Sequence, residues 1–571
     1  MDRAIPPHAM TGSPPPTLEI KVSRTLVFLI LLAGVVVLHL PLLRLPYFWD
    51  EAGYYVPAAR DLLLTGSLIP HSTPSNAHPP LVMGYLAACW KIFGFSPLVT
   101  RLAMLIVSAF ALLGVYRLAL RVSNASVAAA STLCVALYPV FFAQSSLAQV
   151  DLAAAGLTFW ALAAYLDRRP LNSAIWFALA VMAKETALLA PLALLGWELI
   201  APWFAERFPS TASLPEPEVE RRASPPAQCA KPSMIVALLV PAGVLACWYG
   251  YHYLRTGYVL GNPEFFRYNV QATLSPLRIA IALLMRLWQI LGYMHLFVLT
   301  LLMAWAMLHP PLGNGGTRAR IAISTQCAFA AIILAYVVVM AVIGGAVLAR
   351  YMLPAVPLVI IIAVSTLWRR MRAWRVLVGV TAAAFVLGWF MNPPYGFAPE
   401  DNLAYRDYVV MHQHAAQYLE QHSSPGPVLT AWPASDELSR PYLGYVSQAI
   451  PVVRVEDFSA EEVMSASEAR ARFNTALMFS TKYEPDRPLL ERWRWWQGVK
   501  QRFFGFHRDL PPPVAAQILG AHLVFQERRD GQWVAVAELE RVFDARRRDQ
   551  QDIRWQECVL TMSHTGRPSA N

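Results

Sequence analysis

The chain has 571 residues, of which 56% are hydrophobic and only 15% are charged, and its mean hydropathy is +0.40. Soluble domains carry about 25% charged residues, so this composition excludes an ordinary soluble protein and indicates a chain largely embedded in a membrane. We interpret the formal net charge of +10 as basic cytoplasmic loops, and we expect no nucleic-acid partner. The six cysteines are scattered without a C-x-x-C pair, which predicts neither a disulfide framework nor a zinc site.

Apolar runs long enough to cross a membrane recur up to about residue 391. The first run follows Lys21 and Arg24 and predicts an uncleaved signal anchor with a cytoplasmic N-terminus. A longer run is divided at Lys184-Glu185 into two short helices. About eleven spans result, at 24–43, 99–119, 124–145, 152–166, 171–190, 187–203, 233–251, 287–308, 321–343, 352–367 and 376–391.

The charges between these runs fall into two alternating sets. Basic clusters occupy the connections near 117–121, 168–169, 207–231, 318–320 and 368–375. This is the positive-inside pattern for a cytoplasmic N-terminus, so the other connections, with mixed signs and many aromatics, lie on the outer face. The apolar segment 78–94 would invert this pattern if it crossed the membrane. We therefore expect an interfacial helix there, lying flat within a first outer loop at 44–98.

After the last run the composition becomes that of a small α/β domain. Strand-like runs stand at 427–432, 450–455 and 475–480, between helical stretches. A hairpin pattern follows, with its turn at Asp530-Gly531. About 180 residues suffice for a separate core. We divide the chain into a transmembrane domain, residues 1–391, and a C-terminal domain, residues 392–571, which an odd number of spans places on the outer, periplasmic face.

Ionisable residues at membrane depth are costly and are therefore candidates for function. In the predicted topology they gather at the outer ends of the helices and are expected to line one cavity: Asp50, Glu51, His78, Asp151, Lys184, Glu185, His252, Arg267 and Arg350. The set combines acids and cations without metal-ligand spacing. A divalent ion between Asp50, Asp151 and His252 is left open, and no other cofactor is expected.

Carboxylates beside cations at a membrane edge suit the transfer of a group from a lipid phosphate. The leaving phosphate needs positive charge where its negative charge develops. The acceptor hydroxyl needs a base within hydrogen-bond reach. We expect the base in the loop that faces the acceptor and the cations at the helix ends that face the phosphate.

Five motifs then follow in order between about residues 24 and 367: FWDEAGYYVPAARDLLLTG, HPPLVMGYL, AQVDLAAAGLTFWALAAYL, MAKETALLAP and ARYMLPAVPL. Together they resemble the GT-C glycosyltransferases that use polyprenyl-phosphate donors, above all the protein O-mannosyltransferases and the lipid A aminoarabinose transferases. The resemblance implies a polytopic helical bundle with juxtamembrane helices in the first outer loop. It also implies a catalytic Asp in that loop and inverting transfer of a hexosyl or pentosyl group.

For the acidic residues, the resemblance matches Asp50 with the catalytic base, Glu51 with its acidic neighbour and Asp151 with the second outer acid. Simpler explanations stay open for all three. Asp50 and Glu51 could complement the dipole of the helix that follows them. Asp151 could be the N-cap of the helix at 152–166.

For the donor phosphate, the resemblance points to Lys184, Arg350 and Tyr351, which match elements bordering the lipid-phosphate site. His78 begins the HPPL motif of the O-mannosyltransferase branch, where the aminoarabinose branch has a phosphate-binding Lys. His252 falls where the latter branch has a site histidine. As alternatives, Lys184 could form a simple ion pair with Glu185, and Arg350 could be an interfacial, snorkelling side chain.

These residues predict an inverting glycosyltransferase of the inner (plasma) membrane. It would move a sugar from a polyprenyl-phosphate-linked donor to a lipid, polysaccharide or protein acceptor on the outer face. One alternative is a transporter or flippase of a lipid-linked sugar, which predicts inverted repeats and broken helices at the midplane. The sequence has no evident repeat, and its ionisable residues stand at helix ends. A membrane anchor for a binding domain would leave these one-sided charges unexplained.

Overall fold

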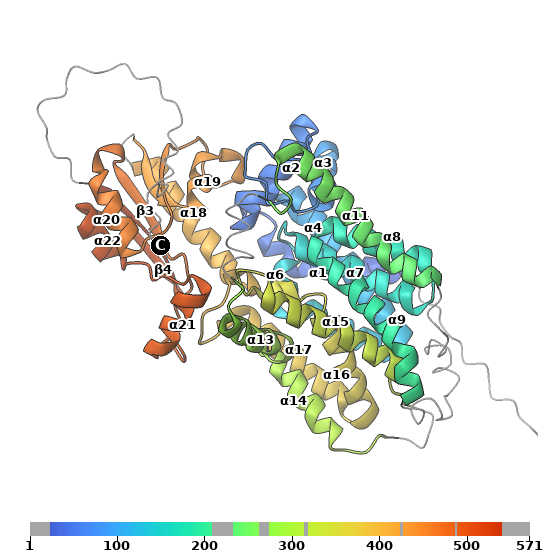
Figure 1. Cartoon of the computed structure of the whole chain (residues 1–571). Helices are drawn as coiled ribbons and strands as arrows, with labels where there is room; N and C mark the ends of the chain where they lie inside the picture. Colours follow the sequence, from blue (N-terminus) through green and yellow to red (C-terminus); the bar gives the residue numbers. More distant parts are fainter. Residues whose placement is uncertain are drawn as a thin grey trace, which may run out of the picture.

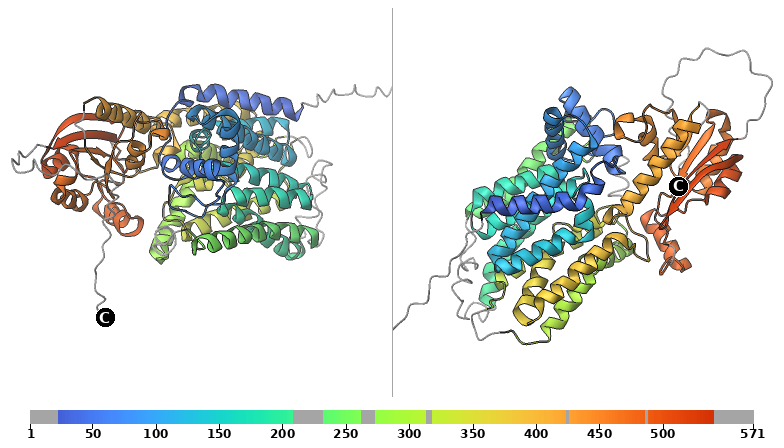
Figure 2. Two further views of the ribbon diagram at one scale, coloured as in Figure 1. Left: turned by 90° about the horizontal axis from the view of Figure 1, so that it is seen from above. Right: turned by 180° about the vertical axis from the view of Figure 1, so that it is seen from behind.

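The computed structural model describes residues 23–207, 232–261, 273–312, 318–422, 426–485 and 488–539. A bundle of apolar helices makes up most of it, and a region containing a β-sheet lies against one end of the bundle (Figures 1 and 2). Most of the predicted basic loop 207–231, Arg267 and the part of the C-terminal domain after residue 539 lie outside the described residues.

Helices cover each of the predicted apolar runs. They are α1 (Arg24–His39), α4 (Pro97–Val122), α5 (Ala125–Leu137), α6 (Pro139–Gln144), α7 (Val150–Leu166), α8 (Pro170–Ala183), α9 (Leu189–Arg207), α11 (Pro232–Thr256), α13 (Pro276–Leu291), α14 (Leu296–Met307), α15 (Ile323–Val342), α16 (Val356–Arg370) and α17 (Trp374–Phe390). Within the described ranges, six helical segments are long and apolar enough to cross a membrane, judged by length and composition. The number of about eleven spans stays a prediction.

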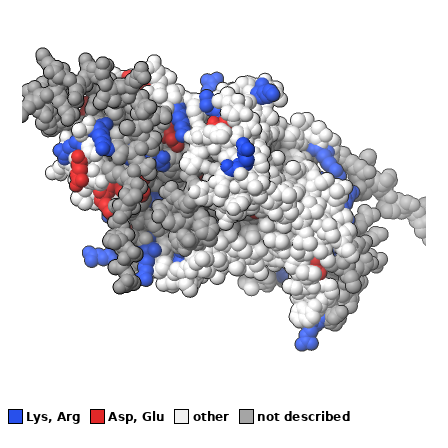
Figure 3. Space-filling model, turned by 45° about the horizontal axis from the view of Figure 1, so that its top comes forward, with Lys and Arg blue, Asp and Glu red and all other residues white. Residues whose placement is uncertain are grey.

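The outer surface of the bundle is apolar. Leu199, Leu301 and Val376 are each more than 60% exposed, although their side chains are hydrophobic. Figure 3 shows a broad uncharged surface over the bundle, with charged side chains on the C-terminal region and toward the ends of the bundle. Exposed apolar surface of this extent is typical of helices that face lipid rather than water.

The predicted break at Lys184 is present. Helix α8 ends at Ala183, Lys184 has an extended backbone with φ −155° and ψ 134°, and a 3₁₀ turn at Glu185–Leu188 leads into α9. At this break Lys184 and Glu185 take different partners, since Lys184 pairs with Asp151 and Glu185 pairs with His78.

The helix order places the two predicted charge sets at opposite ends of the bundle. At one end, Arg121 pairs with Asp167 at 2.7 Å, and Arg168 pairs with Glu198 at 2.7 Å. The predicted outer-face acids and cations lie at the other end, beside the C-terminal region. This separation agrees with the positive-inside argument, and the side of the membrane that each end faces stays a prediction.

Helix α13 begins eleven residues before the expected run at 287. Its added turns carry Arg278 and Arg286, whose charges lower the hydropathy of the sequence there, and both side chains are buried. Arg278 Nη2 donates to the carbonyl of Gly344 at 2.8 Å, and Arg286 Nη1 donates to the carbonyl of Leu348 at 2.7 Å. The two guanidinium groups thus hold the segment that leads into Arg350.

The first outer loop contains a π-helical turn (η2, Glu51–Tyr55) and two helices, α2 (Val56–Thr65) and α3 (Leu81–Phe93). Helix α3 occupies the segment predicted to be interfacial. Its 13 residues reach about 20 Å at about 1.5 Å per residue, which is shorter than the roughly 30 Å hydrocarbon core. The helix is therefore too short to cross a membrane of that thickness upright.

The C-terminal region contains a five-stranded sheet of order β2-β1-β3-β5-β4. Its elements are α18 (Ala404–His422), β1 (Val428–Ala431), α19 (Ala434–Ser439), β2 (Val452–Val455), α20 (Ala460–Glu468), β3 (Thr475–Phe479), α21 (Arg494–Phe504), α22 (Pro512–Leu519), β4 (Ala521–Arg529) and β5 (Gln532–Leu539). Strand β1 is parallel to β2 and β3, and β5 is antiparallel to β3 and β4.

All three predicted strand-like runs form strands, and the predicted hairpin turn is present. Asp530 and Gly531 have φ angles of +40° and +85°, the left-handed pair that a two-residue hairpin turn requires. The sequence did not predict α18, which lies between the sheet and the bundle (Figure 1). The division of the chain into two domains stays a prediction.

One hydrophobic core runs from the first outer loop into the C-terminal region. Phe48 packs edge-on against Tyr408, with ring centroids 5.2 Å apart, and the Tyr445 hydroxyl donates to the carbonyl of Tyr47 at 3.0 Å. Trp432 lies against Gly53, where an added Cβ would stand 2.5 Å from its ring. The residues around Asp50 are thus enclosed by the bundle on one side and by the C-terminal region on the other.

Candidate active site

Asp50 stands at a distorted point of the backbone. Trp49 has a φ of +44°, which is unusual for a bulky residue, and Asp50 leads directly into the π-helical turn. Contacts from the C-terminal region hold Trp49 in place, because its ring lies 5.5 Å from the rings of both Tyr408 and Trp432. Such strained conformations persist where the surrounding structure enforces them, and they are frequent at functional sites.

Arg350 is the centre of the cluster that contains Asp50. Its Nη2 lies 2.5 Å from Asp50 Oδ2, its Nε lies 3.3 Å from Asp151 Oδ2, and its Nη1 contacts Glu400 Oε1. The same Nη1 donates to Gln149 Oε1 at 2.7 Å. Arg350 is buried, so the three carboxylates offset the cost of removing its charge from water. It points into the protein and is not a snorkelling side chain.

Lys184 supplies a second cation. Its Nζ lies 2.5 Å from Asp151 Oδ1 and 4.1 Å from the centre of the Tyr351 ring, an arrangement that combines an ion pair with a cation–π contact. Asp151 therefore joins Lys184 to Arg350. The N-cap of α7 is Gln149, and Asp151 lies inside the first turn with its oxygens on the two cations. The simple capping role for Asp151 is therefore wrong.

Glu51 lies on a different contact network from Asp50. Both of its oxygens bind the guanidinium of Arg101, and Oε2 also accepts from the backbone N–H of Phe48 at 2.9 Å. The backbone N–H of Ala148 donates to Oε1. Glu51 and Arg101 are 0% and 1% exposed. This pair fixes the start of the first outer loop to α4 and to the segment before α7.

His78 and His252 form a neighbouring group around the 70–80 segment. His78 Nδ1 donates to Glu185 Oε2 at 2.8 Å, and the imidazole stacks on Tyr55 with centroids 5.9 Å apart. Glu185 therefore pairs with His78 and not with Lys184. His252 Nε2 lies 2.8 Å from the hydroxyl of Ser75, and its Nδ1 donates to the carbonyl of Tyr258 at 2.7 Å.

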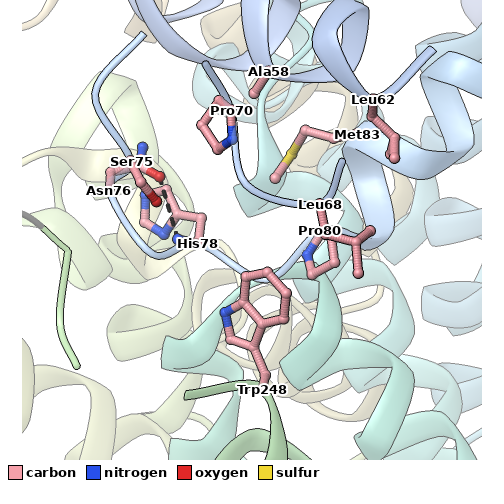
Figure 4. A pocket seen from close by; sticks show the side chains of 10 residues that line it. All are labelled: Ala58, Leu62, Leu68, Pro70, Ser75, Asn76, His78, Pro80, Met83 and Trp248. Atoms are coloured by element: carbon pink, nitrogen blue, oxygen red, sulfur yellow. Dashed lines mark hydrogen bonds between the residues drawn. The ribbon is translucent and has the colours of Figure 1, made fainter. Parts of the chain in front are cut away.

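A small pocket lies beside this group (Figure 4). Ser75, Asn76 and His78 form its polar side, and the Trp248 ring closes another side, with its Nε1 donating to the carbonyl of Ala77 at 2.9 Å. Apolar side chains from α2, α3 and the connecting loop complete the lining: Ala58, Leu62, Leu68, Pro70, Pro80 and Met83.

The residues considered for a divalent ion do not come together as a ligand set. Arg350 stands between Asp50 and Asp151, and His252 is engaged by the loop around Ser75. Within the described ranges, no group of three or more His, Cys, Asp or Glu residues is placed to hold a metal ion. The guanidinium of Arg350 occupies the position between the carboxylates in which a bridging cation would stand.

The structure adds residues that the sequence reasoning missed. Glu400 and Gln149 bind Arg350, and Arg101 binds Glu51. Burial raises the pKa of Glu400 to about 7, against the opposing effect of Arg350. Burial also raises the pKa of Asp401 to about 8, although the Tyr293 hydroxyl donates to its carboxylate at 2.6 Å.

Two signals in the sequence could have found these residues. Glu400-Asp401 is a second acidic pair shortly after an apolar run, as Asp50-Glu51 is. Arg101 is the fifth residue of α4, and the apolar stretch that follows it carries no further charge until Arg117. A charge in such a position needs a buried partner and therefore predicts one.

Comparison with known proteins gives one family match and several structural matches. Residues 77–214 match the dolichyl-phosphate-mannose-protein mannosyltransferase family. No curated protein matches the sequence of the chain. The crystal structure of ArnT from Cupriavidus metallidurans bound to undecaprenyl phosphate has 15% identity and a TM-score of 0.50, over 89% of this chain and 97% of that one.

Two further structures are less similar. The same ArnT in the apo state has 15% identity and a TM-score of 0.48, over 90% of this chain and 98% of that one. The Archaeoglobus fulgidus oligosaccharyltransferase in complex with Zn and sulfate has 13% identity and a TM-score of 0.43, over 89% of this chain and 72% of that one. The similarity to the undecaprenyl-phosphate-bound ArnT structure shows the fold of this chain. The chain has the fold of the GT-C glycosyltransferases, and the mannosyltransferase family match over residues 77–214 supports the same superfamily, as the motifs predict.

Proposed function

We propose that this chain is an inverting glycosyltransferase that moves a sugar from a polyprenyl-phosphate-linked donor to a hydroxyl acceptor at the outer face of the inner membrane. The observation that carries the proposal is the gathering of Asp50, Asp151 and Lys184 around Arg350 at one end of an apolar bundle. The mannosyltransferase family match, and the undecaprenyl phosphate in the similar ArnT structure, support a lipid-phosphate donor.

We assign Asp50 as the base. Among the three carboxylates on Arg350, its side chain is 19% exposed, whereas those of Asp151 and Glu400 are 3% and 5% exposed. An incoming acceptor hydroxyl can therefore reach Asp50 more readily than the other two. General-base catalysis of this kind contributes about 10²–10⁴ in rate, and a single displacement at the anomeric carbon inverts it.

We assign Arg350 and Lys184 to the leaving phosphate. Asp151 Oδ2 and Arg350 Nε face each other at 3.3 Å, and both atoms are buried without a hydrogen-bond partner in the described part of the chain. The Arg350 N–H is a donor that a phosphate oxygen can accept from, whereas the Asp151 carboxylate repels an anion, so the phosphate would approach from the guanidinium side. A phosphate that binds the two cations would compete with Asp50 for Arg350. Donor binding would then free Asp50 to accept the proton of the acceptor.

The other predicted residues have positioning roles in this proposal. Tyr351 orients the ammonium of Lys184 through its ring, and Asp151 sets the spacing between Lys184 and Arg350. Glu51 fixes the loop that presents Asp50, and so acts through the backbone. His78 and His252 hold the 70–80 segment on the donor side of the site.

The test is Asp50→Asn, assayed in proteoliposomes with a labelled polyprenyl-phosphate sugar. We expect transfer to fall by about 10²–10⁴ while donor binding persists, because Asn keeps the shape but loses the basic oxygen. Asp167→Asn is the matched control, since Asp167 lies at the opposite end of the bundle in an ion pair with Arg121. Near-normal transfer by Asp50→Asn would show that Asp50 is not the base. If the wild-type protein moved the lipid-linked donor across the vesicle membrane without forming a glycosylated product, a transporter would be favoured.

Orientation is tested by labelling single cysteines from outside intact cells, in a background in which the six native cysteines are replaced. Met464 is 54% exposed on α20, and Arg372 is exposed at the opposite end of the bundle. We expect an impermeant maleimide to label Met464→Cys and to leave Arg372→Cys unlabelled until the membrane is opened. The reverse pattern would place the site on the cytoplasmic face.

A further inference from the structure

Helix α21 projects from the C-terminal region beside the bundle (Figures 1 and 2). None of its eleven residues is buried. Two large apolar side chains at its start face outward, Trp493 at 52% exposed and Trp495 at 61% exposed, and Leu489 just before it is 61% exposed. Aromatic side chains with this exposure are costly in water, but they are favoured at the interface between a bilayer and water.

The surroundings of α21 place it at the level of a predicted membrane surface. Arg278 Nε, in the first turn of α13, donates to the carbonyl of Phe503 at 3.1 Å, and its guanidinium carbon lies 5.3 Å from the Phe504 ring. Helix α13 is the first part of the candidate membrane span Pro276–Met307, whose helical backbone is broken at Met294 before α14 begins. Both ends of α13 contact loops at the same end of the bundle, through Arg278 and Gly344 and through Trp288 and Tyr395. Helix α21 therefore lies beside this end of the bundle, where the polar headgroups of a bilayer begin.

The apolar surface continues from α21 onto α13. Leu277 and Leu284 of α13 are 57% and 67% exposed, and Trp288 is 45% exposed. The Trp288 Nε1 donates to the Tyr395 hydroxyl at 3.0 Å, which adds a second aromatic at this level. The outward tryptophans of α21 thus extend the exposed apolar surface of α13.

The charge of this segment is strongly positive. Residues 489–508, LLERWRWWQGVKQRFFGFHR, contain five Lys or Arg residues and one Glu. Arg492, Arg494 and Arg502 are exposed. Basic residues near a membrane surface attract anionic lipid. Basic and aromatic residues interleaved on a surface helix are typical of interfacial lipid contact.

We propose that α21 and the residues just before it, 489–504, form an interfacial anchor that binds the outer leaflet through anionic phospholipid headgroups and holds the C-terminal region against the membrane. The inference requires that the bundle spans the membrane. It does not depend on the transfer reaction or on the identity of the base. Its failure can therefore be distinguished from the failure of the proposed glycosyltransferase function.

The test uses the full chain in nanodiscs with the photo-crosslinker p-benzoylphenylalanine at position 495 in place of Trp495. The matched control carries the crosslinker in place of Met464 on α20, which has a similar exposure of 54%. We expect phospholipid adducts, detected by mass spectrometry, at position 495 and only background at position 464. The yield should rise when phosphatidylglycerol is added to phosphatidylcholine.

The variant Arg492→Gln/Arg494→Gln, combined with the crosslinker at 495, tests the charge. We expect it to lower the phosphatidylglycerol adduct yield on the order of thirty-fold, with little change in pure phosphatidylcholine. Equal adduct yields at positions 495 and 464 would overturn the proposal. Adducts at 495 that respond neither to phosphatidylglycerol nor to the arginine changes would overturn the anionic headgroup as the partner. Protein–protein adducts in place of lipid adducts would overturn the membrane as the occupant.

Discussion

The guanidinium of Arg350 binds the carboxylate of Asp50 at 2.5 Å, although the two residues are 300 positions apart in the sequence. The contact joins the first outer loop to the short turn before α16, across the end of the bundle. The same guanidinium also holds Asp151 and Glu400. One buried side chain therefore connects the proposed base, the second acid and the segment that enters the C-terminal region.

Arg350→Lys should nearly abolish transfer. The planar guanidinium reaches separate carboxylates from Nε, Nη1 and Nη2, whereas an ammonium is a single point charge that cannot reproduce this geometry. We expect a loss of about 10²–10³ in turnover, the usual cost of removing a preorganised charge from a site. The measurement is initial-rate kinetics in proteoliposomes. Arg255→Lys, exposed at the end of α11, should be neutral. Normal turnover in Arg350→Lys would contradict the phosphate role.

Arg101→Met should destabilise the protein strongly, because it leaves the carboxylate of Glu51 buried without its cation. Breaking a buried pair in this way costs about 3–5 kcal/mol. The measurement is the shift in thermal unfolding in detergent. The control is Arg121→Met, whose pair with Asp167 is about one-quarter exposed on each side and should contribute about 1 kcal/mol or less. Equal shifts in the two variants would show that the Glu51–Arg101 pair has no special structural role.

The double variant Glu51→Met/Arg101→Met separates structure from chemistry. It removes both charges and should recover part of the lost stability, because no charge stays buried and unpaired. The recovery is partial because the backbone N–H groups of Phe48 and Ala148 lose their acceptor. If Glu51 only positions the loop, donor binding should recover with stability. Recovered stability with no recovery of donor binding or transfer would show that the Glu51 carboxylate itself takes part in the reaction.

Gly53→Ala should loosen the C-terminal region from the first outer loop. An added Cβ would lie 2.5 Å from the ring of Trp432, which is closer than atoms can approach, so the ring or the loop must move. We expect faster hydrogen exchange in the segment around Trp432 and a lower transfer rate. Gly84→Ala in α3 is the control, because its Cβ would meet only Leu62 at 3.9 Å. Unchanged exchange around Trp432 would show that the contact is not required.

Glu400→Gln should change how stability depends on pH. Burial raises the pKa of Glu400 from 4.5 to about 7, so between these values the folded protein binds more protons at this site than the unfolded chain. Stability from this group therefore falls as the pH rises from about 4.5 to about 7. Gln does not titrate, so the melting temperature of the wild type minus that of Glu400→Gln should decrease from pH 5 to pH 7.5. A difference that is constant or increases over this range would contradict the raised pKa.

The sequence by itself determined the features that depend on local chemistry. Apolar length predicted where the helices lie, and the charged pair at Lys184-Glu185 predicted the break between α8 and α9. The turn residues Asp530-Gly531 predicted the hairpin, because Asp and Gly readily adopt the left-handed backbone that a two-residue hairpin turn requires. The ordered motifs predicted the GT-C fold, which the likeness to undecaprenyl-phosphate-bound ArnT confirms.

Only the tertiary structure decided which charges meet. It paired Glu51 with Arg101, Lys184 with Asp151, and Arg350 with Glu400 as well as Asp50, and it placed His252 on Ser75 away from the two aspartates. It also packed α18 against the first outer loop, where Tyr408 contacts Phe48, and placed α21 beside α13. The physical reason is that a buried charge selects its partner from the helices that pack around it. That choice depends on how segments hundreds of residues apart come together, which local sequence does not specify.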